Sequence, residues 1–277
     1  MISHQHVYDS DVRPSPLRDA FKDLYRYRAL VRLLVGRDLT VRYKRSLFGV
    51  TWTVLNPLLQ TLVMWLVFYH LFHFSMPGRV PYLVYLLSGV LVVNYFSQGV
   101  AATAASMAAS ASTLTKVYVP PVVFAFSAAC GGAVNFLFGM VPLIAFMLAL
   151  GPGLRWSLLL VPVPLLFLLA MIAGIGLFLA TLVIRFDDIL NLVNVLLMLV
   201  GYLTPTFWVV TIIPRRYEHL IYLNPLYAYM NVCRYLDYGG VAPSWICVPI
   251  VVLTGTLGLI VGLAVFVRRW PTLAVLL

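Results

Sequence analysis

The chain has 277 residues, of which 62% are hydrophobic and only 10% are charged, whereas about 25% of residues are charged in an average soluble domain. Its mean hydropathy of +0.96 excludes an ordinary soluble domain and indicates a polytopic membrane protein, most simply with one compact domain. The formal net charge is +10, but ten of the 19 lysines and arginines precede Thr51, ahead of the first apolar run. This charge is typical of a segment at the membrane surface, and it gives no reason to expect a nucleic-acid site.

The N-terminal part of the chain divides into a polar tail and a basic amphipathic segment. Residues 1–16 are polar and interrupted by proline, which is typical of a mobile tail. From Leu17 onward, apolar residues recur at helical spacing and most basic residues fall on the opposite side. This pattern predicts a helix lying in the membrane interface over residues 17–46, with a break at Gly36 before the second basic stretch.

Six apolar stretches follow, each close to the roughly 20 residues that cross a bilayer core. With the N-terminus inside, 14 lysines and arginines fall on the inner side and five on the outer side. Because basic residues are enriched on the cytoplasmic side, both termini are expected there. The sequence thus predicts an all-α membrane protein with one transmembrane domain over residues 17–277. The expected spans are residues 50–74, 82–107, 121–150, 157–183, 189–212 and 245–267.

Two connections between these spans are long enough to have structure of their own. The inner loop, residues 107–121, has small and hydroxyl side chains before Lys116, and a plain connector fits it as well as a short cytoplasmic helix. The outer loop, residues 212–244, contains six tyrosines and is too apolar for a solvent loop. Backbone at membrane depth must be covered by protein or line a water-filled cavity. We therefore expect one or two short re-entrant or interfacial helices, broken at Asn224-Pro225.

The chain lacks the motifs of several functional classes. No GxxxxGK[ST] sequence occurs, so the chain is expected to have no P-loop and to bind no ATP itself. It also has no HExxH, CxxC or GxSxG sequence, and its three cysteines lack the spacing of metal ligands, so no metal or other cofactor is expected. Charged residues are almost missing from the spans, which disfavours a carrier coupled to protons or sodium.

Aromatic residues make up 14% of the chain, and several of them are patterned. Four lie at positions i, i+3, i+4 and i+7 of the first span and therefore share one helix face. The large apolar faces of aromatic rings suit a conduit for sugars, although core packing and an interfacial aromatic belt explain the same pattern. The predicted conduit residues are Trp65, Phe68, Tyr69, Phe72, Tyr95, Phe96, Tyr202, Phe207 and Trp208.

Small residues in the last span predict a close helix contact. Gly258 and Gly262 form a GxxxG sequence, and Gly255 lies one turn earlier. Such glycines allow two helix backbones to approach each other. A contact within one subunit is favoured here over a seam between two copies.

Four segments occur together in an order typical of one family: RDLTVRYKRSLFGVTWTVLNPLLQ (37–60), KVYVPPVV (116–123), RFDD (185–188) and YLNPLYAYMNVCRY (222–235). Over about residues 20–270 the chain resembles the permease subunit of ABC-2 type polysaccharide exporters, which move O-antigen, teichoic acid and capsule chains. One departure is visible, because relatives often have a polar pair after the first proline of the second segment, where this chain has Pro121-Val122.

The resemblance implies an assembly and a role for each segment. It implies a homodimer in the bacterial inner membrane, with two copies of a separate ATPase subunit that bind ATP and Mg. The interface helix would lie where a lipid-linked polysaccharide enters among membrane lipids. Its cations would attract a pyrophosphate, although anchoring to anionic headgroups explains them equally well. The residues implied are Arg37, Arg42, Lys44 and Arg45 for this entrance, Thr113, Thr115, Lys116, Val117 and Tyr118 for coupling to the ATPase, and Tyr217, Tyr222, Asn224, Pro225, Tyr227 and Tyr229 for an outer gate.

The sequence therefore predicts the permease subunit of an ATP-driven exporter of a lipid-linked polysaccharide of O-antigen, teichoic acid or galactan type. Two other functions remain open. One is an ABC-2 exporter of a lipid or a drug. The other is a membrane-embedded enzyme of glycan assembly, whose only candidate acid/base pair is Asp187-Asp188. Adjacent helical residues diverge by about 100°, so this pair is poorly suited to catalysis.

Overall fold

The structure is a computed structural model that describes residues 16–44, 46–71, 80–114, 116, 119–150, 153–186, 188–239 and 241–273. Within these ranges every regular element is a helix. The predicted tail lies outside them except for Pro16, which begins the first helix. The α-helices are α1 (Pro16–Arg26), α2 (Arg28–Tyr43), α3 (Trp52–Leu66), α4 (Tyr82–Ala109), α5 (Ala111–Leu114), α6 (Pro121–Leu150), α7 (Pro162–Val183), α8 (Ile189–Leu203), α9 (Pro225–Tyr238) and α10 (Cys247–Leu273).

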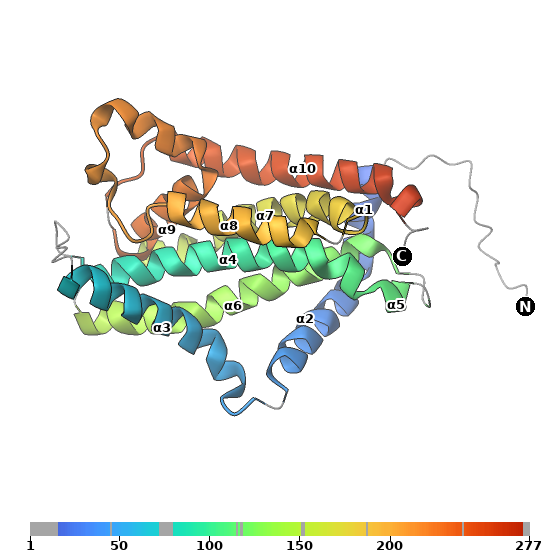
Figure 1. Cartoon of the computed structure of the whole chain (residues 1–277), viewed down its shortest axis with the longest axis horizontal. Coiled ribbons are helices and arrows are strands. Elements are labelled where there is room, and N and C mark those ends of the chain that lie inside the picture. Colours follow the sequence, from blue (N-terminus) through green and yellow to red (C-terminus); the bar gives the residue numbers. More distant parts are fainter. Residues whose placement is uncertain are drawn as a thin grey trace, which may run out of the picture.

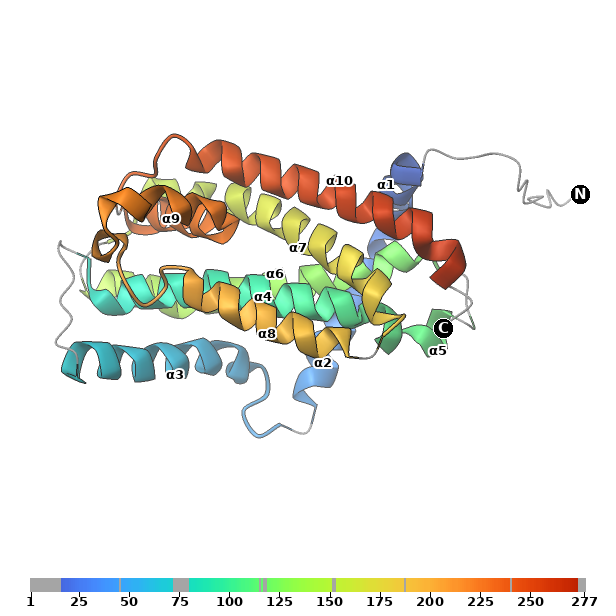
Figure 2. The same cartoon turned by 45° about the horizontal axis from the view of Figure 1, so that its top comes forward.

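The long helices lie side by side along one axis (Figure 1). α1, α5 and the last turns of α10 lie at one end of this bundle, and α9 lies near the other (Figures 1 and 2). The main core is formed by α4, α6, α7, α9 and α10. α2 and α3 diverge from the bundle and are joined near residues 46–51, where the short 3-10 helix η1 (Gly49–Thr51) begins the first span (Figure 1).

Five helical segments are long and apolar enough to cross a membrane, judged by length and composition within the described residues. They match five of the six predicted spans. The remaining prediction, 189–212, is too long, because α8 ends at Leu203 after 15 residues. Thr204 is extended (φ −85°, ψ 134°) and precedes Pro205, whose ring disfavours a helical conformation in the preceding residue. The five segments are Gly49–Tyr69, Tyr82–Ala109, Pro121–Leu150, Trp156–Val183 and Cys247–Leu273.

The interface segment is docked on the bundle. Ala20 and Leu34 are buried in a cluster with Phe266 of α10 and residues of α6 and α7. Burial, together with the nearby Asp19, raises the pKa of the Asp23 carboxyl above its ordinary value. This docking also explains why α10 runs to Leu273, beyond the predicted end at 267, since its last turns have α1 to pack against.

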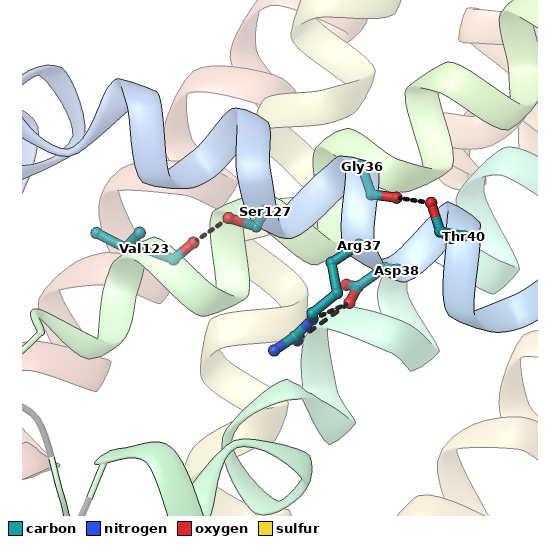
Figure 3. Close-up of polar contacts among 6 residues, drawn as sticks. All are labelled: Gly36, Arg37, Asp38, Thr40, Val123 and Ser127. Atoms are coloured by element: carbon teal, nitrogen blue, oxygen red, sulfur yellow. Dashed lines mark hydrogen bonds and ion pairs between the residues drawn. The ribbon is translucent and has the colours of Figure 1, made fainter.

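The predicted break at Gly36 is wrong. The helix is interrupted at Tyr27 (φ −94°, ψ 18°), and α2 then continues through Gly36 to Tyr43. The Thr40 hydroxyl donates a 2.8 Å hydrogen bond to the Gly36 carbonyl inside this helix (Figure 3). A single glycine costs a helix only about 1 kcal/mol relative to alanine, and the packing of Leu34 against the bundle outweighs that cost.

The closest helix contact joins α7 and α10. A Cβ atom on Gly174 would overlap the Gly258 carbonyl, and one on Gly262 would overlap the Gly174 carbonyl. A Cβ on Gly255 would lie 2.7 Å from the Phe167 carbonyl oxygen. The predicted close contact within one chain is therefore confirmed, with α7 as the partner helix.

Candidate functional site

Two adjoining cavities lie where α2 and α3 diverge from α4 and α6. The first, of about 180 Å³, lies among α2, α4 and α6. The second, of about 310 Å³, lies between the start of α3 and the same two helices. Both are lined by Gln98, Gly132 and Asn135, so the cavities are neighbours. They form a partly polar recess in a largely apolar bundle.

The first cavity has the predicted entrance cation Arg37 at its edge. The Arg37 guanidinium donates to the Asp38 carboxylate at 3.1 and 3.2 Å, and both side chains are about half exposed (Figure 3). Across from them, the Ser127 hydroxyl of α6 donates to the Val123 carbonyl at 2.6 Å. Arg37 thus has its own counter-charge, and an exposed pair of this kind contributes little stability, so an incoming anion can displace Asp38.

Of the other three predicted entrance residues, the structure describes the side chain of Lys44 alone. Lys44 is exposed at the end of α2. The side chain of Arg42 and the whole of Arg45 lie outside the described residues. The idea of a cationic entrance therefore depends, within the described structure, on Arg37 and Lys44.

A third cavity, of about 360 Å³, lies among α3, α4 and α8. It shares Asn94 and Gln98 with the second cavity, and the Asn94 amide donates a 3.1 Å hydrogen bond to the Gln60 side chain of α3. Asn194 of α8 also lines it. A row of uncharged amides therefore runs through the cavities along α4.

Sequence reasoning missed this amide row because single Asn and Gln residues belong to no motif. A signal was present nevertheless. Asn56 and Gln60, and likewise Asn94 and Gln98, are four residues apart and so share a face of one apolar span. Polar side chains are costly in a membrane span unless they meet polar partners, so two such pairs indicate a polar recess.

The predicted aromatic conduit is divided between different environments. Trp65 and Tyr69 are stacked with ring centroids 5.3 Å apart. Phe68 stacks on Phe207 at 6.3 Å and packs in a cluster at the start of α4. Tyr69 lies in the short π-helix η2 (Val67–Leu71), which continues α3, and is 47% exposed. Tyr202 lies on α8 and is 60% exposed. These two tyrosines are the conduit residues best placed to meet a ligand or a second subunit.

The remaining predicted conduit residues do not continue this exposed surface. Phe96 is buried in the core. Tyr95 is also buried, with its ring 5.6 Å from that of Phe136, but it lines the second cavity. Trp208 is half-buried in the bend after α8, and Phe72 lies outside the described residues.

The outer segment folds as two short helices with the predicted break between them. The 3-10 helix η5 (Arg215–Leu223) ends immediately before Asn224, and α9 begins at Pro225. The Asn224 side chain accepts the Leu226 N–H at 3.1 Å and donates to the Thr204 hydroxyl at 2.8 Å. The same residue therefore caps α9 and ties it to the end of α8.

Two of the predicted outer-gate tyrosines are structural. Tyr229 is fully buried, and its hydroxyl donates to the Val251 carbonyl of α10 at 2.9 Å. Tyr227 is buried with its ring 5.6 Å from that of Tyr222. Both rings are thus packed inside the chain, and their gate role stays a prediction. Tyr217 is half exposed and is available for contacts.

Arg234 of α9 is the most important residue that sequence reasoning missed. It is only 7% exposed, and its guanidinium donates to the Tyr85 and Pro205 carbonyls, each at 3.0 Å. The guanidinium also lies over the Tyr85 ring, 3.6 Å from its centroid. Tyr85 in turn donates to the Trp208 carbonyl at 2.9 Å. These bonds fasten α9 to the start of α4 and to the bend after α8.

Comparison with known proteins identifies the family. A family model described as ABC-2 type transporter matches residues 29–238. This chain belongs to the ABC-2 type transporter family. Among similar proteins is the O-antigen export system permease protein RfbA of Klebsiella pneumoniae, which is 30% identical over 240 residues, covering 86% of this chain and 90% of the relative. A protein of the same name from Myxococcus xanthus is 29% identical over 219 residues, covering 78% and 83%.

Membership of the ABC-2 family makes this chain a transmembrane transporter subunit and removes the glycan-assembly enzyme from consideration. The matched residues run from α2 to α9, so they include the three cavities and Arg234. The family also implies a partner ABC ATPase.

For an ABC-2 protein, the connection between α4 and α6 is the expected contact with that ATPase. A short helix, α5, lies in it, at the same end of the bundle as α1 (Figure 1). Thr113 is in α5, and the exposed Lys116 donates its backbone N–H to the Thr113 carbonyl at 3.1 Å. Thr115, Val117 and Tyr118 lie outside the described residues, so their predicted coupling role remains a prediction.

Proposed function

We propose that this protein is the permease subunit of an ATP-driven exporter that moves a lipid-linked polysaccharide out of the bacterial cytoplasm. The observation that carries the proposal is similarity over about 90% of the length of a permease named for O-antigen export. The uncharged, amide-lined recess and the exposed tyrosines Tyr69 and Tyr202 support it. Amides and aromatic faces suit sugars, which present hydroxyl groups around an apolar ring face.

The topology that suits this function has six membrane crossings within one domain, residues 17–277, after a tail over residues 1–16. α8 is the shortest crossing at 15 residues, or about 22 Å of helix. The bend after it and the outer helices η5 and α9 would complete the remaining depth as re-entrant structure. The excess of basic residues in the N-terminal segment and at Arg268 and Arg269 favours cytoplasmic termini.

A homodimer would cover the faces of α3 and α8. Only 11% of the most apolar window of the first span is buried in the chain, against 72% for α4. Apolar side chains along α3 and α8, including Leu62, Val63 and Leu199, are about half exposed. Together with Tyr69 and Tyr202, these faces would meet the second copy around the glycan path. Two ATPase copies, which would hold the ATP and Mg, would bind at the α5 end.

Replacing Tyr69 and Tyr202 together by alanine should reduce glycan export at least several-fold, because both rings are removed from the proposed path. The measurement is surface glycan in cells whose own gene is replaced by the variant. The amount of ATPase that co-purifies should stay unchanged, since neither ring is buried in the core.

The matched control is Trp156→Ala, because Trp156 is 90% exposed but lies in the 3-10 helix η3 (Trp156–Leu160), away from α3 and α8. Export should be normal in this variant. Normal export in the double tyrosine variant would contradict a path along α3 and α8. It would favour an ABC-2 exporter whose cargo is a lipid or a drug.

A further inference from the structure

The second cavity, between the start of α3, α4 and α6, is polar and uncharged. Its polar lining includes Asn56, Asn94, Gln98 and Asn135, and no charged side chain lines it among the described residues. Each amide can donate and accept hydrogen bonds. At about 310 Å³, the cavity falls at the lower end of the range for small-molecule sites. It has room for a ligand of the size of a single sugar ring.

Two buried polar atoms in this cavity have no partner among the described residues. Tyr95 is 3% exposed, yet its hydroxyl makes no hydrogen bond, and the side-chain oxygen of Asn135 is in the same state. Both residues line the cavity. Buried polar groups without a partner are rare in native proteins and cost stability. A polar molecule in the cavity would satisfy both.

The Tyr95 ring fits beside α6 because residue 132 is a glycine. A Cβ atom on Gly132 would lie 3.3 Å from the Tyr95 ring and 3.5 Å from the Gly99 Cα atom. Glycine at this position therefore leaves room for the ring beside α6. The Trp52 indole, at the first turn of α3, adds a half-buried aromatic face to the lining.

This combination selects one class of ligand. An anion or a cation would enter a cavity with no opposite charge, which is costly away from water. An acyl chain would leave the Asn135 side-chain oxygen and the Tyr95 hydroxyl unpaired. A neutral sugar offers hydroxyl groups to the amides and an apolar ring face to Trp52.

We propose that the second cavity is a subsite for one uncharged sugar unit, held within a single subunit by Trp52, Tyr95 and Asn135. The proposal rests on the proposed glycan-export function and places an additional contact inside one chain, apart from the exposed Tyr69 and Tyr202. The cavity adjoins the Arg37 cavity on one side and the third cavity on the other. The subsite therefore lies on the amide row of α4.

The test is photo-crosslinking in cells that export their glycan through this protein. The photoreactive residue p-benzoylphenylalanine is placed at Trp52 and, in a second variant, at Ser46, which also lines the cavity. A variant with the probe at the exposed Trp156 is the background control, and one with the probe at Tyr202 reports the path along α8. Glycan attached to the protein is detected by a shift in mass and by lectin binding. Glycan at position 46 or 52 well above the Trp156 background is expected.

Tyr95→Phe then asks whether the unpartnered hydroxyl binds the sugar. Crosslinked glycan at position 46 should fall by about 2- to 10-fold, as for the loss of one neutral hydrogen bond. The thermal stability of the protein should not fall, since the hydroxyl has no partner to lose among the residues that the structure describes. Tyr235→Phe, at an exposed tyrosine of α9 that belongs to none of the predicted sites, should change neither quantity.

Three results would overturn the subsite. The first is crosslinking to phospholipid alone at positions 46 and 52. The second is an absence of crosslinked glycan at these positions while the probe at position 202 does crosslink glycan. The third is an unchanged amount of crosslinked glycan at position 46 in Tyr95→Phe. The second result would leave the export function intact. If the proposed export function itself were wrong, the results would differ in two ways. The probe at position 202 would crosslink no glycan either, and depletion of the protein would leave glycan export normal.

Discussion

Replacing Arg234 by methionine should prevent the outer end of the bundle from assembling. The guanidinium is buried and supplies donors to the carbonyls of Tyr85 and Pro205, and methionine keeps much of the side-chain length but none of the donors. A hydrogen bond from a charged group contributes about 1.5–3 kcal/mol, so the loss of two should cost about 3 kcal/mol or more. The variant would also remove the favourable charge interaction that Arg234 makes with the buried Asp237 of the same helix. Thermal unfolding of the purified protein in detergent measures the effect.

Two further variants isolate the reason for this loss. Arg216→Met removes an exposed arginine from the same outer segment and should leave stability unchanged. Arg234→Lys keeps the charge, but one ammonium group cannot reach two separate carbonyls as the planar guanidinium does. The stability of this variant should therefore lie between those of Arg234→Met and Arg216→Met. Equal stability of Arg234→Met and Arg216→Met would show that the network does not hold the outer segment.

Gly262→Ala should be nearly as damaging, although it adds only one methyl group. That methyl would overlap the Gly174 carbonyl of α7, which is helix backbone and cannot rotate away as a side chain can. Overpacking of this kind typically costs about 1–3 kcal/mol, and occasionally more. The yield of folded protein and its midpoint of thermal unfolding should both fall.

The matched control lies one turn away in the same GxxxG sequence. A Cβ on Gly258 would meet only Met171, with its Cα atom at 3.6 Å and its Cγ atom at 3.8 Å, which are ordinary contacts. Gly258→Ala should therefore be tolerated. If the two variants behave alike, α7 and α10 do not cross as described, or the motif is used chiefly between subunits.

The elements that sequence reasoning predicted best depend on composition and on local chemistry. Apolar stretches located five spans because length and hydropathy are properties of the segment itself. The break at Asn224-Pro225 was predictable because proline favours the start of a helix and asparagine caps it. The GxxxG contact was recognisable for a similar reason, although nothing in the sequence pairs it with Gly174.

What sequence reasoning missed depends on which residues meet in three dimensions. Tyr229 and Tyr69 look alike in the sequence, yet one is buried against α10 and the other is half exposed. Arg234 resembled a surface charge because its partners are mostly backbone carbonyls. Any residue type has such a carbonyl, so these partners cannot be recognised from the sequence. The end of α8 at Leu203 could have been predicted from Pro205. The apolar residues that continue beyond Pro205 favoured a longer span instead.

The arrangement separates the tasks of a transporter along the length of the bundle. At one end, α1 is docked on α10, at the same end of the bundle as α5 (Figure 2). At the other end, Arg234 and Asn224 fasten the outer helices to α4 and α8. The amide row lies between these ends.

The most direct test of glycan export is depletion of this protein in its native host, followed by separate measurement of lipid-linked glycan on the two faces of the cell membrane. Full-length glycan should accumulate on the inner face while it disappears from the outer face. Normal amounts of glycan on the outer face after depletion would contradict the export of a polysaccharide by this protein.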